Sequence, residues 1–199
     1  MKPPSSVRER ILFEATRLFA ERSYERTSVA DVQEAAGLTR GSGALYKHFL
    51  SKEALLTEIV ERFVVEAQAG QTTLRDLTSA SDVNLSWIVG NTLEKLALNR
   101  DALRIFWRDL DPFPALKAKV QKDVTQSTYL VMADWLAERQ RRGELRTHDA
   151  EAVAAIVIGS ITMFRVFEAL WGERAIRVSD QRFADAWRDV LSHALRRKA

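Results

Sequence analysis

The chain has 199 residues, of which 46% are hydrophobic and 29% charged, a composition that is ordinary for a soluble globular protein of one or two domains. The net charge of +3 excludes a polycation, so any affinity for nucleic acid has to come from the local arrangement of charges. The absence of cysteine excludes disulfides, thiolate nucleophiles and cysteine-ligated zinc.

The first predicted element is a helix that begins after Ser6. Ser6 and Glu9 form a capping box, and apolar residues recur at helical spacing as far as Phe19. A polar break over residues 23–26 ends this helix. Charged side chains stand near the N-terminus where a signal peptide needs apolar ones, so we expect no secretion and a cytoplasmic location.

The next segment predicts two short helices joined by a glycine turn. Ser28 and Asp31 begin the first of them, and Gly37 ends it in the left-handed C′ position. The second is rich in hydroxyl and basic side chains. No acidic residue occurs between Ala35 and Lys52, although the whole chain has 27. This pattern favours contact with a polyanion.

A helix-turn-helix reads DNA by laying the start of its second helix along base edges in the major groove. Ala44, Leu45 and Phe49 can anchor that helix from behind, and Arg40 is the candidate for a bidentate contact with guanine. The residues that we predict to contact DNA are Ser28, Thr39, Arg40, Ser42, Gly43, Tyr46, Lys47, His48 and Lys52. Tyr46 taken alone is also compatible, though less so, with a core tyrosine that keeps its hydroxyl in water.

The rest of the chain also predicts helices. The residues that we expect to begin them are Ser51, Asp101, Asp111-Pro112, Thr147 or Asp149, and Ser179. No alternating strand pattern of any length is present. The sequence therefore predicts an all-α fold of about nine helices.

The residues from Arg10 through Leu56 (RILFEATRLFAERSYERTSVADVQEAAGL, then ALYKHFLSKEALL) closely resemble the N-terminal domain of TetR-type transcriptional regulators. The resemblance implies a three-helix DNA-binding domain over residues 1–50, in which Tyr46 and Lys52 touch phosphates. It also implies a ligand-binding and dimerisation domain over residues 51–199. The activity that the resemblance implies is that of a repressor released from DNA by a small molecule.

The sequence departs from the family pattern in one place. The interval from Gly37 to Tyr46 is two residues longer than the common spacing. Residues 39–43 therefore form a longer turn or a distorted helix start, and which side chains face the bases stays open.

Aromatic and methionine side chains are concentrated in the second domain. Each of them is individually more typical of a core than of a binding site. As a set, they predict a pocket for an apolar or aromatic effector, or a cationic one, formed by Trp87, Phe106, Trp107, Met132, Trp135, Met163 and Phe167.

The last two helices are expected to form the interface of a homodimer. The uncharged run over residues 152–164 is too short to span a bilayer, so burial against partner helices is the simpler interpretation. In the family these two helices pair across a two-fold axis. Two copies would then read the halves of a palindromic operator in double-stranded DNA.

Two other classes of function are an enzyme and a binding module. The histidines His48, His148 and His193 belong to no catalytic or metal-binding motif, so we predict no enzyme, no cofactor, no metal and no membrane partner. The remaining alternative is a helical ligand- or protein-binding module on the same scaffold without operator specificity.

Overall fold

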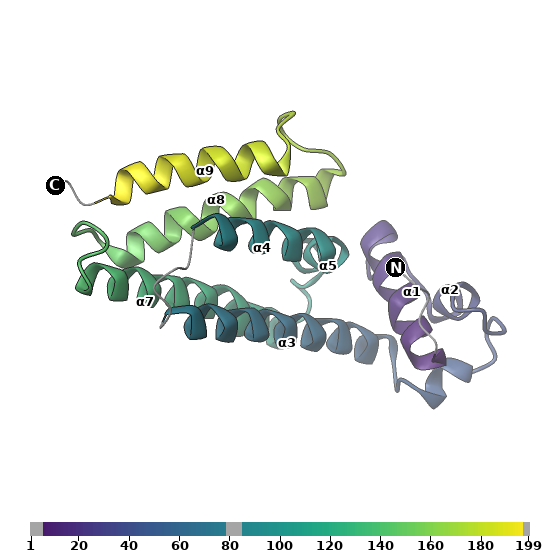
Figure 1. Ribbon diagram of the computed structural model, residues 1–199. Coiled ribbons are helices and arrows are strands. Elements are labelled where there is room, and N and C mark those ends of the chain that lie inside the picture. The colour runs from purple at the N-terminus through teal and green to yellow at the C-terminus, as the bar shows by residue number, and fades with distance from the viewer. Residues whose placement is uncertain (1–5, 79–84, 197–199) are drawn as a thin grey trace. The chain divides into compact units, whose positions relative to one another are not determined.

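A computed structural model of the protein describes residues 6–78 and 85–196, and these residues confirm the all-α prediction (Figure 1). The helices are α1 (Val7–Arg22), α2 (Val29–Ala35), α3 (Lys52–Thr78), α4 (Leu85–Leu98), α5 (Arg100–Asp109), α6 (Pro114–Val120), α7 (Ser127–Arg141), α8 (Ala150–Trp171) and α9 (Asp180–Leu195). A 3-10 helix, η1 (Ala44–Lys47), lies between α2 and α3, and a π-helix, η2 (Gln121–Gln126), joins α6 to α7.

Hydroxyl and carboxylate caps begin several helices where the sequence predicts them. The Ser6 hydroxyl accepts the Glu9 amide at 3.1 Å, and the Ser179 hydroxyl accepts an amide in the first turn of α9. Of the two candidates before α8, Asp149 is the cap, because its carboxylate accepts the Ala152 amide at 3.0 Å. Side-chain capping is a local interaction, which is why the sequence alone locates these helix starts.

The predicted start at Asp111-Pro112 is wrong. These residues form a turn in which the Phe113 amide donates to the Leu110 carbonyl at 2.9 Å, and α6 begins two residues later. Pro114 occupies the first position of the helix, where a proline loses no hydrogen bond. Pro112 and Pro114, two positions apart, could each occupy the first position of the helix, and the turn places Pro114 there.

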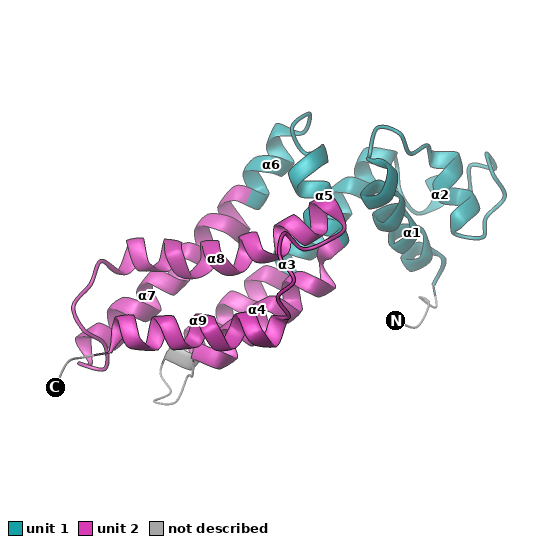
Figure 2. Cartoon of the chain, turned by 90° about the horizontal axis from the view of Figure 1, so that it is seen from above, with its two compact units in different colours: residues 1–65, 101–120 teal, residues 66–100, 121–199 magenta. Residues whose placement is uncertain are grey.

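The chain divides into two compact units (Figure 2). Unit 1 comprises residues 1–65 and 101–120, and unit 2 comprises residues 66–100 and 121–199. Unit 1 is larger than the DNA-binding domain predicted over residues 1–50, because ion pairs join the first half of α3 to α1. Arg62 of α3 pairs with Glu9 at 2.6 Å, and Glu58 pairs with Arg8 at 3.0 Å.

Unit 1 also includes α5 and α6, which come from far along the chain. Phe106 of α5 packs edge-on against Phe63 of α3, with 4.8 Å between the ring centroids. Arg108 donates to the main-chain oxygens of Phe19 and Ala20 at the end of α1. The compact unit that contains the predicted DNA-binding segment therefore also contains residues 101–120, from much later in the chain.

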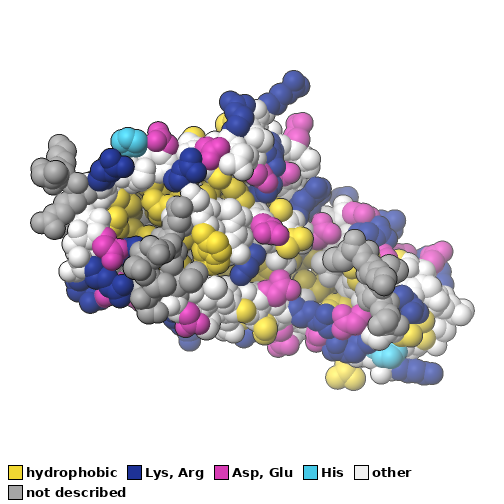
Figure 3. Space-filling view, in the orientation of Figure 1, with side chains coloured by type: hydrophobic (Ala, Val, Ile, Leu, Met, Phe, Trp, Pro, Cys, Tyr) yellow, Lys and Arg dark blue, Asp and Glu magenta, His cyan; other side chains and the backbone are white. Residues whose placement is uncertain are grey.

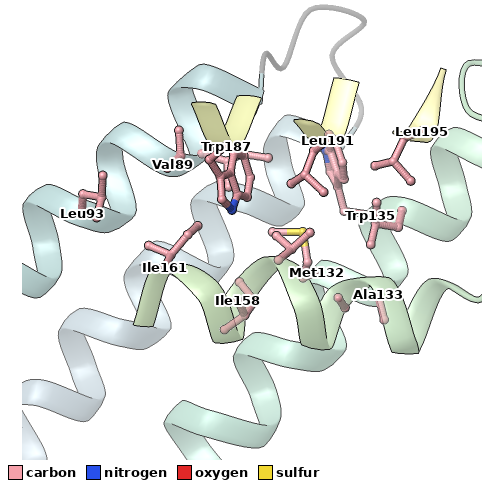
Figure 4. Packing of buried hydrophobic residues seen from close by; sticks show 14 residues of the cluster. Val89, Leu93, Met132, Ala133, Trp135, Ile158, Ile161, Trp187, Leu191 and Leu195 are labelled. Atoms are coloured by element: carbon pink, nitrogen blue, oxygen red, sulfur yellow. The ribbon is translucent and has the colours of Figure 1, made fainter. Parts of the chain in front are cut away.

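The core of unit 2 lies between α4, α7, α8 and α9 (Figure 4). Side chains from these four helices point toward one another, with Met132, Trp135 and Trp187 among the largest. Helix α8 is long and apolar enough to cross a membrane by length and composition, more so than its 13-residue uncharged run suggested. Of the most apolar 18-residue window of α8, 39% is buried inside the structure, and Val157 and Ile161 are among the buried residues.

Candidate nucleic-acid interface

The start of α2 is held by a complete capping box. The Ser28 hydroxyl accepts the Asp31 amide at 3.1 Å and donates to the Asp31 carboxylate at 2.7 Å, while the Ser28 amide donates to the same carboxylate at 2.9 Å. These hydrogen bonds from Ser28 hold the pKa of Asp31 below its ordinary value. Ser28 is exposed and defines where the helix begins.

Three glycines with positive φ shape the segment between α2 and η1. Gly37, Gly41 and Gly43 have φ of +73°, +72° and +69°, a region that side chains rarely adopt. Gly37 ends α2 as predicted. The Gly41 amide donates to the side chain of buried Gln33 at 2.9 Å, which fixes the longer turn to α2.

The second short helix of the motif is a single 3-10 turn in this chain. Gly43 in the left-handed region prevents an α-helix from extending upstream of Ala44, so η1 has only four residues. Leu45 and Phe49 are buried behind it, as the sequence predicts. The lengthened turn therefore shortens the element that follows it.

Most of the predicted DNA-contacting residues lie together on the exposed surface of this segment. The exposed members are Thr39, Arg40, Ser42, Tyr46, Lys47 and His48, and Gly43 is half-buried. Tyr46 is 54% exposed, which excludes the core interpretation of this tyrosine. The segment thus presents hydroxyl, phenol, imidazole and cationic groups on an apolar anchor.

Arg40 is not pointed freely into solvent. Its guanidinium pairs with Glu34 at 2.6 Å and with Asp31 at 3.3 Å, both on α2. The hydrogen bond to Glu34 raises the pKa of Arg40 above its ordinary value. Contact with a guanine would require this arginine to leave the α2 carboxylates.

Lys52 differs from the other predicted contacts because it is half-buried and already bound. Its Nζ donates to the main-chain oxygens of Tyr24 and Thr27, each at 3.0 Å, and lies 4.2 Å from the centroid of the Tyr24 ring. Sequence reasoning missed this contact. Nothing in the local pattern links Lys52 to a turn more than twenty residues earlier.

Comparison with known protein families identifies the fold. Residues 11–59 match the family model of bacterial regulatory proteins of the tetR family, and residues 97–197 match that of the AefR-like transcriptional repressor C-terminal domain. The second match alone covers half of the chain.

The chain belongs to the TetR family. Over 61 residues it is 39% identical to the HTH-type transcriptional repressor KstR2 of Mycolicibacterium smegmatis, covering 31% of this chain and 29% of that protein. Over 60 residues it is 45% identical to KstR2 of Rhodococcus jostii, covering 30% and 28% of the two chains. The matched segment thus spans less than a third of either relative.

Solved structures of TetR-type regulators share the whole fold. The ketosteroid transcriptional regulator KstR2 of Mycobacterium tuberculosis aligns with a TM-score of 0.73 at 20% identity, over 98% of this chain and 97% of that chain. The fatty acid degradation regulator FadR of Bacillus halodurans aligns with a TM-score of 0.67 at 15% identity, over 96% of each chain. At these identities the likeness establishes the fold.

The predicted effector residues of this TetR-family chain are divided between the two compact units. Phe106 and Trp107 belong to unit 1, and the other five belong to unit 2. Met132 and Trp135 are buried in the unit 2 core, Phe167 is half-buried and stacks on Trp171, and the exposed members are Trp87, Trp107 and Met163. The seven predicted effector residues therefore differ in their environment, and aromatic content alone does not distinguish buried from exposed positions.

Proposed function

We propose that this TetR-family protein is a ligand-responsive repressor that binds a palindromic operator as a homodimer. The observation that carries the proposal is the exposed group of donors on residues 39–48, which stands on the buried anchors Leu45 and Phe49. Side chains of this kind supply both phosphate contacts and base-edge contacts in DNA complexes. Tyr46 and Lys47 are assigned to phosphates, and Thr39, Arg40 and Ser42 to the base edges.

The homodimer is assigned to α8 and α9. Large apolar side chains remain exposed on these helices, with Ile156 at 63%, Trp171 at 63% and Val190 at 65%. Ile156 and Met163 are seven residues apart and so lie on one face of α8. Figure 3 shows hydrophobic side chains gathered on the surface of unit 2 between charged ones. An Ile156→Glu, Val190→Glu variant should sediment as a monomer if these helices form the interface.

The effector is assigned to unit 2, with an apolar or aromatic body. Met132 and Trp135 supply apolar surface there, and the buried indole Nε1 of Trp135 has no hydrogen-bond partner among the described residues. An effector with one acceptor group would satisfy that donor. This assignment is tested by screening hydrophobic compounds for those that change the melting temperature of the protein and its affinity for the operator. Trp135→Phe should weaken the binding of any compound that does so.

Release from DNA would follow from a population shift. An effector that binds more tightly to the dimer state in which the DNA-reading turns are wrongly spaced shifts the population toward that state. The size of this shift is limited by the difference between the effector's affinities for the two states. Operator and effector would then weaken each other by the same factor. Equilibrium titration of each in the presence of the other measures that factor.

One observation favours the alternative of a binding module without operator specificity. Arg40, the candidate base reader, is bound to the carboxylates of α2. Selection of bound fragments from sheared genomic DNA with the purified protein distinguishes the two functions. A repressor enriches a palindrome, whereas a module without an operator enriches none.

A further inference from the structure

The turn between α1 and α2, residues 23–27, determines where α2 begins. Ser23 has φ of +83°, and fully buried Thr27 donates its hydroxyl to the Ser23 main-chain oxygen at 2.8 Å. Ser28 follows at once and caps α2. Any displacement of this turn therefore displaces α2, together with the glycine-rich turn that Gln33 attaches to it.

Lys52 holds this turn from the start of α3. An ammonium group has three protons, and two of them are donated to the oxygens of Tyr24 and Thr27 at 3.0 Å. The ring of Tyr24 covers a further side of the charge at 4.2 Å. Turning this ammonium toward a phosphate would break both hydrogen bonds. The main-chain oxygen of Thr27, a fully buried residue, would then lose this donor.

Asp109 holds the same turn from the end of α5. Its carboxylate accepts the Tyr24 amide at 3.1 Å and pairs with Arg108 at 2.9 Å. Arg108 in turn donates to the oxygens of Phe19 and Ala20, the last-turn carbonyls of α1, where a cation is favoured. Carbonyls of α1 and the amide of the turn are thus bound by two consecutive residues.

Tyr24 is the point where the two attachments meet. Its amide is held by Asp109 and its carbonyl by Lys52, and its ring packs edge-on against Phe19 and Phe113 at 5.1 and 5.0 Å. Burial raises the pKa of its phenol. A main chain bound on both its polar groups, with its ring packed on two sides, has little freedom to move.

We propose that Lys52 and Asp109 are positioning residues for DNA binding, which clamp the α1–α2 turn at Tyr24, and that the Lys52 ammonium makes no phosphate contact. The inference rests on the proposed DNA-binding function. It replaces the phosphate role that the family resemblance implies for Lys52. It also assigns α5, through Asp109, a function in DNA binding.

Salt dependence separates a clamp from a phosphate contact. Each phosphate neutralised contributes about 0.9 to the slope of log affinity against log salt concentration. In the proposed homodimer Lys47→Met removes two exposed lysines, one from each copy of η1, and should lower the slope by about 1.8. Lys52→Met should leave the slope unchanged and weaken operator binding by about tenfold through the lost charged hydrogen bonds. A slope lowered by Lys52→Met as much as by Lys47→Met would overturn the inference.

Asp109→Asn tests the clamp without touching a cation. Removing a negative charge from a DNA-binding protein strengthens binding by general electrostatics, so a loss of affinity points to positioning. We expect weaker operator binding, a smaller ratio of operator to random-sequence affinity and an unchanged salt slope, all measured where circular dichroism shows a folded protein. Affinity and ratio equal to those of the unmodified protein would overturn the inference.

Lys52→Arg is the matched conservative variant. Its guanidinium can reach both carbonyls, so it should recover most of the affinity lost in Lys52→Met. If Lys52→Met fails to fold, Asp109→Asn and Lys52→Arg decide the question. An unmodified protein without operator preference would instead contradict the proposed function, which keeps the two failures distinct.

Discussion

The side-chain amide of Gln71 donates to the main-chain oxygen of Asp123 at 3.2 Å, where η2 departs from α-helical hydrogen bonding. The same nitrogen lies 3.4 Å from the Val124 oxygen and 3.1 Å from the Thr128 hydroxyl, and the Gln71 oxygen accepts the Ser127 hydroxyl at 2.9 Å. Gln71 is 7% exposed. A buried glutamine of α3 thus supplies hydrogen bonds to a π-helical segment of unit 2.

Gln71→Leu should therefore destabilise the protein by about 1–3 kcal/mol, because part-buried main-chain oxygens lose their donor. Urea unfolding followed by circular dichroism measures this. Gln68→Leu is the matched control, since Gln68 is exposed one turn earlier on α3 and should change stability little. Equal effects of the two variants would show that the η2 contacts are unimportant to stability.

Gly43→Ala and Gly90→Ala should change stability in opposite directions. Gly43 has φ of +69°, where alanine is strained by about 1 kcal/mol, although nothing lies within 4 Å of the added carbon. Gly90 lies within α4 with equally open space, and alanine there should stabilise by about 0.5–1 kcal/mol. Thermal unfolding tests the pair, and a neutral Gly43→Ala would contradict the left-handed turn before η1.

Acid should weaken the attachment of α3 to α1. Hydrogen bonds from Arg62 hold the pKa of Glu9 below its ordinary value of 4.5, and those from Arg8 do the same for Glu58. The folded-state pKa is the lower one, so the stabilisation is present above pH 4.5 and is lost as the pH falls through the folded-state values.

Arg62→Gln should accordingly flatten the dependence of unfolding free energy on pH below pH 4.5. The exposed side chain of Glu61 on the same helix provides the control, and Glu61→Gln should keep the dependence of the unmodified protein. An acid profile unchanged by Arg62→Gln would contradict the assigned ion pairs.

Glu34→Gln should release Arg40 for contact with DNA. Loss of the 2.6 Å ion pair leaves Asp31 as the remaining partner, so operator affinity should increase. Arg40→Ala should relax preference at one base position, where a bidentate contact discriminates by about 1–3 kcal/mol. Glu25→Gln removes the same charge from another exposed position and controls for general electrostatics. Unaltered base preference in Arg40→Ala would show that this arginine does not read the operator.

The sequence predicts those parts of this fold that depend on local chemistry. Ser28 with Asp31, Gly37 and Ser179 each act on residues within one helical turn, and the structure confirms them. The exposed donors of residues 39–48 were predicted for the same reason, because charge pattern and apolar anchors lie in one short segment.

Interactions between distant segments account for what the sequence did not predict. Lys52 with Tyr24, Asp109 with Tyr24, and Gln71 with Asp123 each join residues separated by 28 or more positions. Composition also does not record which unit a side chain packs in, so the assignment of the aromatic residues to an effector pocket stays a prediction.

Repression as proposed here requires that two copies of the glycine-rich turn and η1 dock on one palindromic duplex. Equilibrium binding of the purified protein to its selected palindrome and to a shuffled duplex of equal length, at moderate salt and without effector, tests it most directly. We expect two chains per palindrome and at least about a thousandfold preference over the shuffled duplex. Equal affinity for the two duplexes would contradict it.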